Sequence, residues 1–234
     1  MTELYDFERA WLAKFSDCLD EAAGEQTRRQ VMAGSRALSA GSSSEQVIAW
    51  TQGAMGRLGA LVDESTARQV MTGCACQYPK QGLRAARQAY EETADLSLVH
   101  GMLQAQFEAF LRDSLELKEE YVELVVSRGW GLAGILDGNR ILATKIPKSG
   151  YLVAYLQEPD PEKRRQYYCH CPRVREILKT QDGLPVSYCY CGAGFYKGIW
   201  EEILQQPVEV QVMESVLDGG EVCTIAITPQ VASR

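Results

Sequence analysis

The chain has 234 residues, of which 46% are hydrophobic and 24% are charged, and its formal net charge is -7 with a pI near 5.0. This is the ordinary composition of a soluble globular protein that has one large domain or two small ones and can build a core without a metal. The acidic balance argues against a large phosphate-binding surface, so we expect no nucleic-acid partner. No stretch reaches the roughly 18 apolar residues that span a bilayer, so we expect no membrane partner either.

The compartment decides how the cysteines are interpreted. The N-terminal segment Met1–Glu8 carries acidic residues where a signal peptide has basic ones. We therefore expect a cytoplasmic, reduced protein. Clustered cysteines in such a protein are typically metal ligands or reactive thiols, whereas in a secreted protein they are typically disulfides.

The first half of the chain has the apolar period of helices. A first helix is predicted by the stripe Leu4, Phe7, Trp11, Phe15 and Cys18 or Leu19, which makes Cys18 a buried core thiol. Ser42 and Glu45 have the spacing of a capping box that opens a second helix. An interruption at Gly73–Pro79 precedes two further predicted helices, at 81–93 and 96–111.

After about Leu115 the apolar period changes from 3.6 to 2, which favours strands. The predicted strands are 121–126, 140–146, 151–156, 166–171 and 186–191, followed by a closing hairpin of 208–215 and 222–227. Asp137–Asn139 is a predicted turn, and helices are predicted from Pro172 to Leu178 and at 194–204. The expected fold is therefore α+β, with a helical N-terminal layer packed with a mostly antiparallel sheet that carries late inserted helices. The expected domains are a helical region, 1–113, and an α+β domain, 114–234.

Six of the eight cysteines form three Cys-x-Cys pairs. On a strand, residues two apart project from one face, so each pair would aim two sulfurs in one direction. If the two predicted strands that end in Cys-x-Cys are neighbours, about 4.8 Å apart, a tetrahedral zinc site is reachable. Zinc is the expected cofactor, with an iron–sulfur cluster or copper as alternatives. The candidate metal ligands are Cys74, Cys76, Cys169, Cys171, Cys189, Cys191 and Cys223.

Other roles for these cysteines stay open. They could pack as small hydrophobic residues in the core, or take part in redox or nucleophilic chemistry. The sequence defines no hydrolytic triad: the chain has only two histidines, His100 and His170, so a catalytic Cys–His pair would have to use one of them. On the strand geometry His170 would point away from its neighbouring cysteines, which makes it a poor ligand.

Aromatic residues are dense in the second half, which suits either an apolar ligand cavity or an ordinary core. The candidate pocket residues are Trp130, Tyr168, Tyr188, Phe195, Tyr196 and Trp200. One dense basic cluster, Lys163–Arg165, is a solvated face or the rim of an anion site.

The segment from Tyr188 to Ile227 resembles the C-terminal half of the 4-vinyl reductase-type domain. That family includes bacteriochlorophyll-related proteins, stand-alone archaeal proteins and phenol-sensing transcription activators. The likeness lies in Cys189 before the Gly-aromatic-x-x-Gly start of a helix (Gly194, Phe195 and Gly198), the Pro-Val-x-Val type strand at 207–212, and the hairpin motif of Gly219 and Cys223. The remaining chain would belong to a cysteine-rich bacterial subfamily.

The resemblance implies a small aromatic or apolar ligand held beside a zinc ion, and a homodimer. It implies that Cys189 and Cys223 are zinc ligands. Ser215 stands where the family has its other hairpin cysteine, and Val212 stands near the position of its acidic ligand. The resemblance therefore requires that Cys169, Cys171, Cys191 or Glu214 replace the missing ligands.

The sequence thus predicts a cytoplasmic protein that binds a small apolar or aromatic ligand and carries a thiolate-bound zinc. The alternative is a hydrolase-type enzyme that acts on a small heterocyclic or sulfur-containing substrate, through a cysteine nucleophile or a metal-bound water. A structural or partner-binding protein is the third class. The sequence names no catalytic residue.

Overall fold

The computed structural model describes residues 7–180 and 183–230 of the chain. It forms two compact units, each built from two separate segments of the sequence. Unit 1 consists of Met1–Cys76 and Cys171–Gly194, and unit 2 of Gln77–His170 and Phe195–Arg234. Each unit is described by itself.

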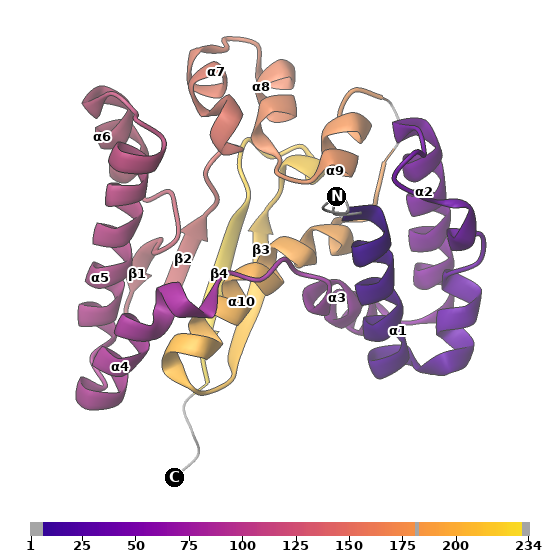
Figure 1. Cartoon of the computed structure of the whole chain (residues 1–234), viewed down its shortest axis with the longest axis horizontal. Helices are drawn as coiled ribbons and strands as arrows, with labels where there is room; N and C mark the ends of the chain where they lie inside the picture. Colours follow the sequence, from indigo (N-terminus) through magenta and orange to yellow (C-terminus); the bar gives the residue numbers. More distant parts are fainter. Residues whose placement is uncertain (1–6, 181–182, 231–234) are drawn as a thin grey trace, which may run out of the picture. The chain divides into compact units, whose positions relative to one another are not determined.

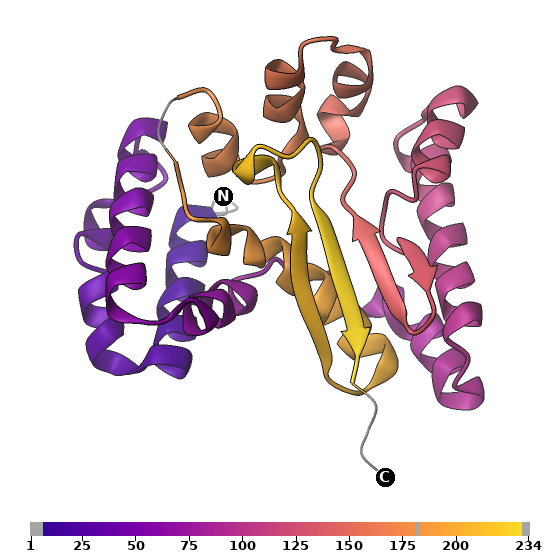
Figure 2. The same ribbon diagram turned by 180° about the vertical axis from the view of Figure 1, so that it is seen from behind.

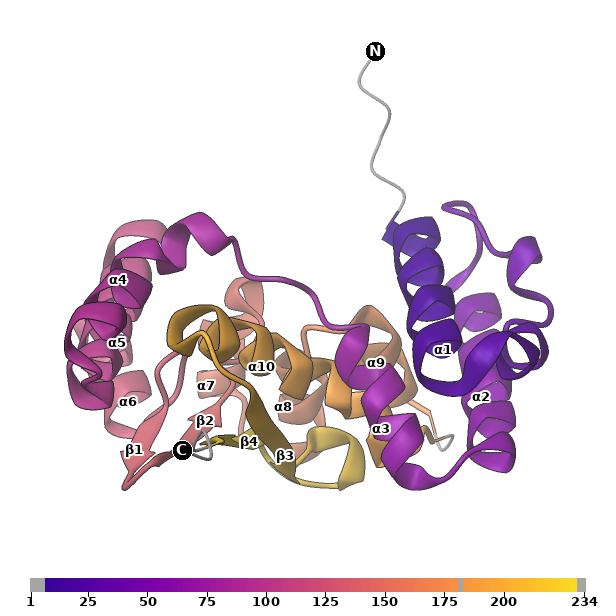
Figure 3. The same ribbon diagram turned by 90° about the horizontal axis from the view of Figure 1, so that it is seen from below.

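Unit 1 is helical in the residues that the structure describes (Figure 1). Its helices are α1 (Phe7–Val31), α2 (Ser44–Leu61), α3 (Glu64–Gly73), α9 (Pro172–Ile177) and the first turn of α10 (Tyr190–Leu204), with 3-10 turns at Ser35–Ala37 and Val186–Cys189. Helix α1 contacts α2 and α3, and α2 contacts α9; Figure 3 shows the first three side by side. The core includes Phe15, Leu19, Leu58, Val70 and Met71.

Unit 2 combines helices with the sheet. Its helices are α4 (Arg84–Thr93), α5 (Leu96–Ala109), α6 (Glu119–Ser127), α7 (Leu152–Gln157), α8 (Pro161–Tyr168) and the rest of α10. A π-helical turn at Phe110–Ser114 follows α5, and 3-10 turns lie at Lys80–Leu83, Ser149–Tyr151 and Val216–Asp218.

The sheet has four antiparallel strands in the order β1-β2-β4-β3. The strands are β1 (Ile135–Asp137), β2 (Arg140–Thr144), β3 (Val208–Glu214) and β4 (Thr224–Pro229). The register aligns Ile141 with Ile227 and Ala143 with Ile225, and all four side chains are buried on one face. Helix α10 lies over β3 and β4 in Figure 1, whereas Figure 2 shows the other face of these strands with no helix in front.

The predicted fold class is confirmed: the chain is α+β, with helices concentrated in its first half and a mostly antiparallel sheet formed late. The strand at 140–146, the closing hairpin, the turn at Asp137–Asn139 and the helices that begin at Pro172 and span 194–204 are all present. The predicted capping box is off by one residue, because Ser43 and Gln46 form it. Leu4 of the predicted apolar stripe lies outside the described residues. The predicted domain division at 113/114 stays a prediction.

Four predicted strands are wrong. Residues 121–126 belong to α6 and 151–156 to α7 with its preceding 3-10 turn, because their buried residues are three apart: Val122 with Val125, and Leu152 with Tyr155. Residues 166–168 end α8, and 186–191 are a 3-10 turn that leads into α10. Short apolar runs with β-branched and aromatic residues fit both the helical period of 3.6 and the strand period of 2. Here the side chains are buried by tertiary packing in the helical arrangement.

Candidate thiol site

The thiols of Cys18 and Cys74 interact with each other in unit 1. Cys18 lies in α1, and Cys74 is the residue that caps the C-terminus of α3. The Cys74 thiol donates a hydrogen bond to the Cys18 sulfur, and this bond lowers the pKa of Cys18. The same hydrogen bond raises the pKa of Cys74, and burial and the negative charges of Cys18 and Cys191 raise it further. The pair can therefore hold one negative charge more readily than two.

Glycine at position 73 makes this contact possible. A Cβ atom on Gly73 would lie 2.7 Å from the Cys18 sulfur, closer than real Cβ contacts. Lys14, one helical turn before Cys18, donates from Nζ to the carbonyl of Ala75. Its positive charge also helps to lower the pKa of Cys18, after the larger effect of the Cys74 hydrogen bond. Helix α1 thus presents a thiol and an ammonium group to the end of α3.

Two further cysteines of unit 1, Cys171 and Cys191, interact with Tyr188, and Cys191 also acts on Cys74. The Tyr188 hydroxyl and the Cys171 sulfur are 3.8 Å apart, and Tyr188 is buried. Burial raises the pKa of Tyr188, and the charges of Cys171 and Cys191 add to that effect. Because Cys191 acts electrostatically on both Cys74 and Tyr188, Cys18, Cys74, Cys171 and Cys191 form one neighbourhood, which we call the thiol cluster.

A buried ion pair lies next to Tyr188. Arg173 is only 2% exposed; it forms an ion pair with Glu8, and its guanidinium carbon is 4.1 Å from the ring centroid of Trp11. The Trp11 ring is 6.4 Å from the ring of Tyr188. The positive charge of Arg173 partly opposes the rise in the pKa of Tyr188. The Arg173 Nε has no hydrogen-bond partner among the described residues.

The first turn of α10 is pressed against the end of α3. A Cβ atom on Gly194 would lie 2.0 Å from the carbonyl oxygen of Thr72 and 2.8 Å from the Cβ of Ala75. Glycine is therefore required at position 194 to bring the segment that carries Cys191 close to the segment that carries Cys74.

The other two cysteines of unit 1 are Cys76 and Cys189. Cys76 is exposed. Cys189 is partly buried at the end of the 3-10 turn before α10. Within the pair Cys74 and Cys76, one thiol is buried and the other is exposed. Neither Cys74 and Cys76 nor Cys189 and Cys191 lie on a strand, so the strand geometry that would point two sulfurs in one direction does not apply to them.

Unit 2 contains the remaining two cysteines, Cys169 and Cys223. Cys169 directly follows α8, and Cys223 immediately precedes β4. Burial raises the pKa of Cys223, while a backbone N–H at Val216, the charge of Lys145 and a hydrogen bond with Ser215 act in the opposite direction. Neither 166–171 nor 186–191 is a strand, so the adjacent strand ends on which the predicted zinc site was based are absent.

Tyr168 organises the surroundings of Cys223. Its hydroxyl accepts a hydrogen bond of 2.8 Å from the Cys223 backbone N–H and donates one to the Lys145 carbonyl. Burial raises the pKa of Tyr168 well above its ordinary value. The phenol therefore stays protonated and joins two segments of unit 2.

Five of the six predicted pocket residues lie in unit 2, and Tyr188 lies in unit 1. Trp130 and Tyr168 both pack against Tyr155, with ring centroids 5.8 and 5.5 Å apart. The Tyr196 ring packs against Phe195, and its hydroxyl donates a hydrogen bond of 3.1 Å to the Gly131 carbonyl. Trp200 is fully buried, and its Nε1 has no hydrogen-bond partner among the described residues.

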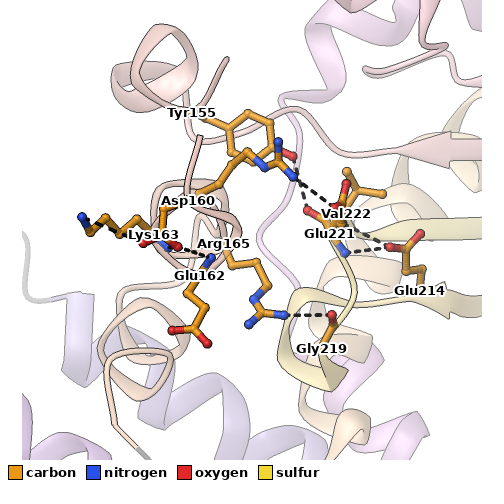
Figure 4. Close-up of polar contacts among 10 residues, drawn as sticks. Tyr155, Asp160, Glu162, Lys163, Arg165, Glu214, Gly219, Glu221 and Val222 are labelled. Carbon is orange, nitrogen blue, oxygen red and sulfur yellow. Dashed lines mark hydrogen bonds and ion pairs between the residues drawn. The ribbon is translucent and has the colours of Figure 1, made fainter. Parts of the chain in front are cut away.

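The basic cluster at 163–165 contacts a loop of its own unit, as Figure 4 shows for the residues that it labels. Arg165 donates a hydrogen bond of 2.9 Å to the Gly219 carbonyl, and Arg164 forms an ion pair with Glu221 at 3.0 Å. The Glu214 carboxylate accepts from the backbone N–H groups of Glu221 and Val222 at 2.9 and 3.3 Å. These contacts hold the loop between β3 and β4 against α8.

Both histidines belong to unit 2, and in each the Nε2 is hydrogen bonded to a backbone carbonyl. The partners are Gly134 for His100, at 2.9 Å, and Ile146 for His170, at 3.0 Å. Since unit 1 has no histidine, any ligand set drawn from its thiol cluster consists of thiolates alone.

A metal would have to fit the thiol cluster by rearrangement of side chains. Within residues 7–180 and 183–230, no group of three or more His, Cys, Asp or Glu side chains is arranged to hold a metal ion. Cys18 and Cys74 are close enough to supply two thiolates, and Cys191 is near enough to Cys74 to act on it electrostatically. The donor type fits zinc or copper(I). The described helices also include none long and apolar enough to cross a bilayer.

Sequence reasoning missed three residues of this site. Cys18 was expected to be a core thiol, Arg173 was expected only as part of the short helix that begins at Pro172, and Lys14 was not considered. The spacing of Lys14 and Cys18, one helical turn apart, could have indicated a thiol with a nearby cation. No local signal pairs Cys18 with Cys74, because 55 residues separate them.

Residues 157–233 match the model of a family described as "Family of unknown function (DUF6144)". The match covers about a third of the chain and includes Cys169, Cys171, Cys189, Cys191 and Cys223. No curated protein matches the chain. No solved structure matches it either.

Proposed function

We propose that this chain is a small-molecule-binding protein that holds a soft metal ion, zinc being the metal expected, at the thiol cluster of unit 1. The observation that carries the proposal is the hydrogen bond between the Cys18 and Cys74 thiols, with Cys191 near enough to act on Cys74 electrostatically. Thiolates in contact repel when both are ionised, and a divalent cation removes that repulsion. The metal ligands proposed are therefore Cys18, Cys74, Cys191 and Cys171.

This ligand set differs from the one implied by the resemblance to the 4-vinyl reductase-type domain. Cys223 interacts with Ser215 and the backbone of Val216 in unit 2, which supports a structural role for it. The resemblance itself stays part of the proposal, as do the cytoplasmic location and the homodimer. What it contributes is the expectation of an apolar or aromatic ligand.

The metal is tested by elemental analysis and zinc titration of the purified full chain. We expect stoichiometric zinc in the wild type and its loss in Cys74→Ser, because a buried ligand is removed. Cys76→Ser is the matched control, because it changes an exposed thiol two residues away and should retain the metal. Equal zinc content in the two variants would contradict the proposed site.

Thiol alkylation separates the metal-binding proposal from the hydrolase alternative. A metal bound by the cluster should protect several cysteines together, and a chelator should release all of them at once. One cysteine that alkylates far faster than the others, with or without chelator, would instead favour a cysteine nucleophile.

The ligand-binding part of the proposal rests on Trp200. An indole N–H that is buried usually has an acceptor, and Trp200 Nε1 has none among the described residues. A small aromatic molecule with a carbonyl oxygen would supply one. We expect benzaldehyde to raise the melting temperature more than toluene does, and Trp200→Phe to abolish the difference. Equal shifts with the two compounds in the wild type would argue against this use of Trp200.

A further inference from the structure

Cys18 and Cys74 have the arrangement of two thiols that can be oxidised together. Cys18 lies in α1 and Cys74 caps α3, and these two helices pack against each other. A Cβ atom on Gly73, the residue before Cys74, would lie 2.7 Å from the Cys18 sulfur, which places this sulfur at the end of α3 beside Cys74. Cys18 is partly exposed, whereas Cys74 is only 3% exposed. A small oxidant therefore reaches Cys18 first and leaves Cys74 as the second thiol.

We propose that Cys18 and Cys74 form an intramolecular disulfide when a hydroperoxide oxidises the chain, which makes the pair a redox modification site of unit 1. The inference goes beyond the proposed function, because the disulfide forms without any metal. It also names a regulation of the same cluster, since a disulfide removes two of the proposed thiolates.

The chemistry balances in two steps. The Cys18 thiol loses its proton to solvent, its thiolate attacks the terminal peroxide oxygen and the O–O bond breaks; Cys18 becomes a sulfenic acid, and the other oxygen leaves as hydroxide or alkoxide and takes a proton back from solvent to give water or an alcohol. The Cys74 thiol then attacks the Cys18 sulfur; the S–S bond forms, the S–O bond breaks, and the departing hydroxide takes the thiol proton and leaves as water. The two thiols lose two electrons in total, and the peroxide gains them.

The remaining cysteines of unit 1 are the internal comparison. Cys76 is more exposed than Cys18, so exposure alone would make it the first thiol to oxidise. Cys18, in contrast, has the Cys74 thiol as its neighbour. The structure thus predicts different products: a disulfide at Cys18 and further oxidation of Cys76.

The test treats the full-length, chelator-washed protein with hydrogen peroxide, blocks the remaining thiols and maps the tryptic peptides by mass spectrometry. Trypsin releases Cys18 in the peptide Phe15–Arg28. It releases Cys74 in the peptide Gln69–Lys80, which also contains Cys76. We expect these two peptides to be linked in the wild type and in Cys76→Ser. In Cys74→Ser the link should disappear, and dimedone should trap a sulfenic acid at Cys18.

A link that survives in Cys74→Ser, or one that is absent from both the wild type and Cys76→Ser, would overturn the inference. Cys18→Ser provides a second variant if Cys74→Ser does not fold, which circular dichroism checks; it too should lose the link. The zinc titration above is a separate readout, so a missing disulfide with normal zinc binding would contradict this inference and leave the proposed metal site standing.

Discussion

The thiols of Cys18 and Cys74 in unit 1 and the thiol of Cys223 in unit 2 have different kinds of neighbours. In unit 1 the thiols of Cys18 and Cys74 interact with each other, and Cys191 acts on Cys74. In unit 2 the thiol of Cys223 interacts with a serine hydroxyl and a backbone N–H, and its pKa is raised by burial. A thiol coupled to another thiol can share a proton, a metal or an oxidising equivalent, whereas a thiol surrounded by backbone groups mainly packs. The comparison assigns reactivity to unit 1 and structure to Cys223.

The largest expected effect concerns Gly194, where α10 meets α3 within unit 1. Gly194→Ala would place a methyl group 2.0 Å from the Thr72 carbonyl, so we expect a loss of about 3 kcal/mol or more in the free energy of unfolding. Gly198→Ala on the same helix is the control, because nothing lies within 4 Å of its added Cβ. It should stabilise the chain by about 1 kcal/mol through helix propensity. Urea denaturation measures both, and equal effects would contradict the packing described here.

The next effect concerns the ion pair beside the thiol cluster. Glu8→Gln leaves the charge of Arg173 buried without a counterion, and we expect a cost of about 3 kcal/mol. Arg173→Met removes the buried charge itself, so its cost should be smaller. Thermal and urea unfolding of the two variants give the order, and a greater loss in Arg173→Met would show that packing on Trp11 matters more than charge.

Tyr168 tests the structural side of the comparison in unit 2. Tyr168→Phe removes the acceptor of the Cys223 backbone N–H and the donor to the Lys145 carbonyl. Because buried backbone groups are then left unsatisfied, we expect a loss of about 2 kcal/mol in stability. Zinc content should stay unchanged in this variant. A loss of metal would mean that unit 2 contributes to the metal site.

The smallest effect is expected for the ion pair between Arg164 and Glu221. Their side chains are 29% and 71% exposed, so solvent screens the interaction. Glu221→Gln should change the free energy of unfolding by about 0.5 kcal/mol or less. A loss of several kcal/mol would mean that the loop between β3 and β4 depends on this pair for its position.

Sequence patterns predicted those elements whose signals are local. Pro172 marks the start of α9, and the alternating residues of β3 with the Gly219-containing connection give the closing hairpin. The runs at 121–126 and 151–156 were misassigned, since Val and Tyr at mixed spacing satisfy both periods until the packing is known. Asp160 before Pro161 is a helix start that could have prevented the error at 166–171.

The candidate site was only partly accessible from sequence. The Cys-x-Cys pattern drew attention to Cys74, Cys171 and Cys191, although the adjacent strands on which the prediction relied are absent. The pairing of Cys18 with Cys74 depends on how α1 packs on α3, and Gly73 and Gly194 show their importance only once the neighbouring atoms are known. Long-range packing of this kind leaves no periodic signal in one sequence.

The central claim is that Cys18, Cys74 and Cys191 can bind one soft metal ion together. Cobalt(II) titration followed by absorption spectroscopy tests it most directly, because the thiolate-to-cobalt charge-transfer band grows with the number of bound thiolates. The band should weaken or vanish in Cys18→Ser, Cys74→Ser and Cys191→Ser, and it should persist in Cys76→Ser and Cys223→Ser. A band that is absent from the wild type, or one that is lost in Cys223→Ser and kept in Cys74→Ser, would contradict the claim.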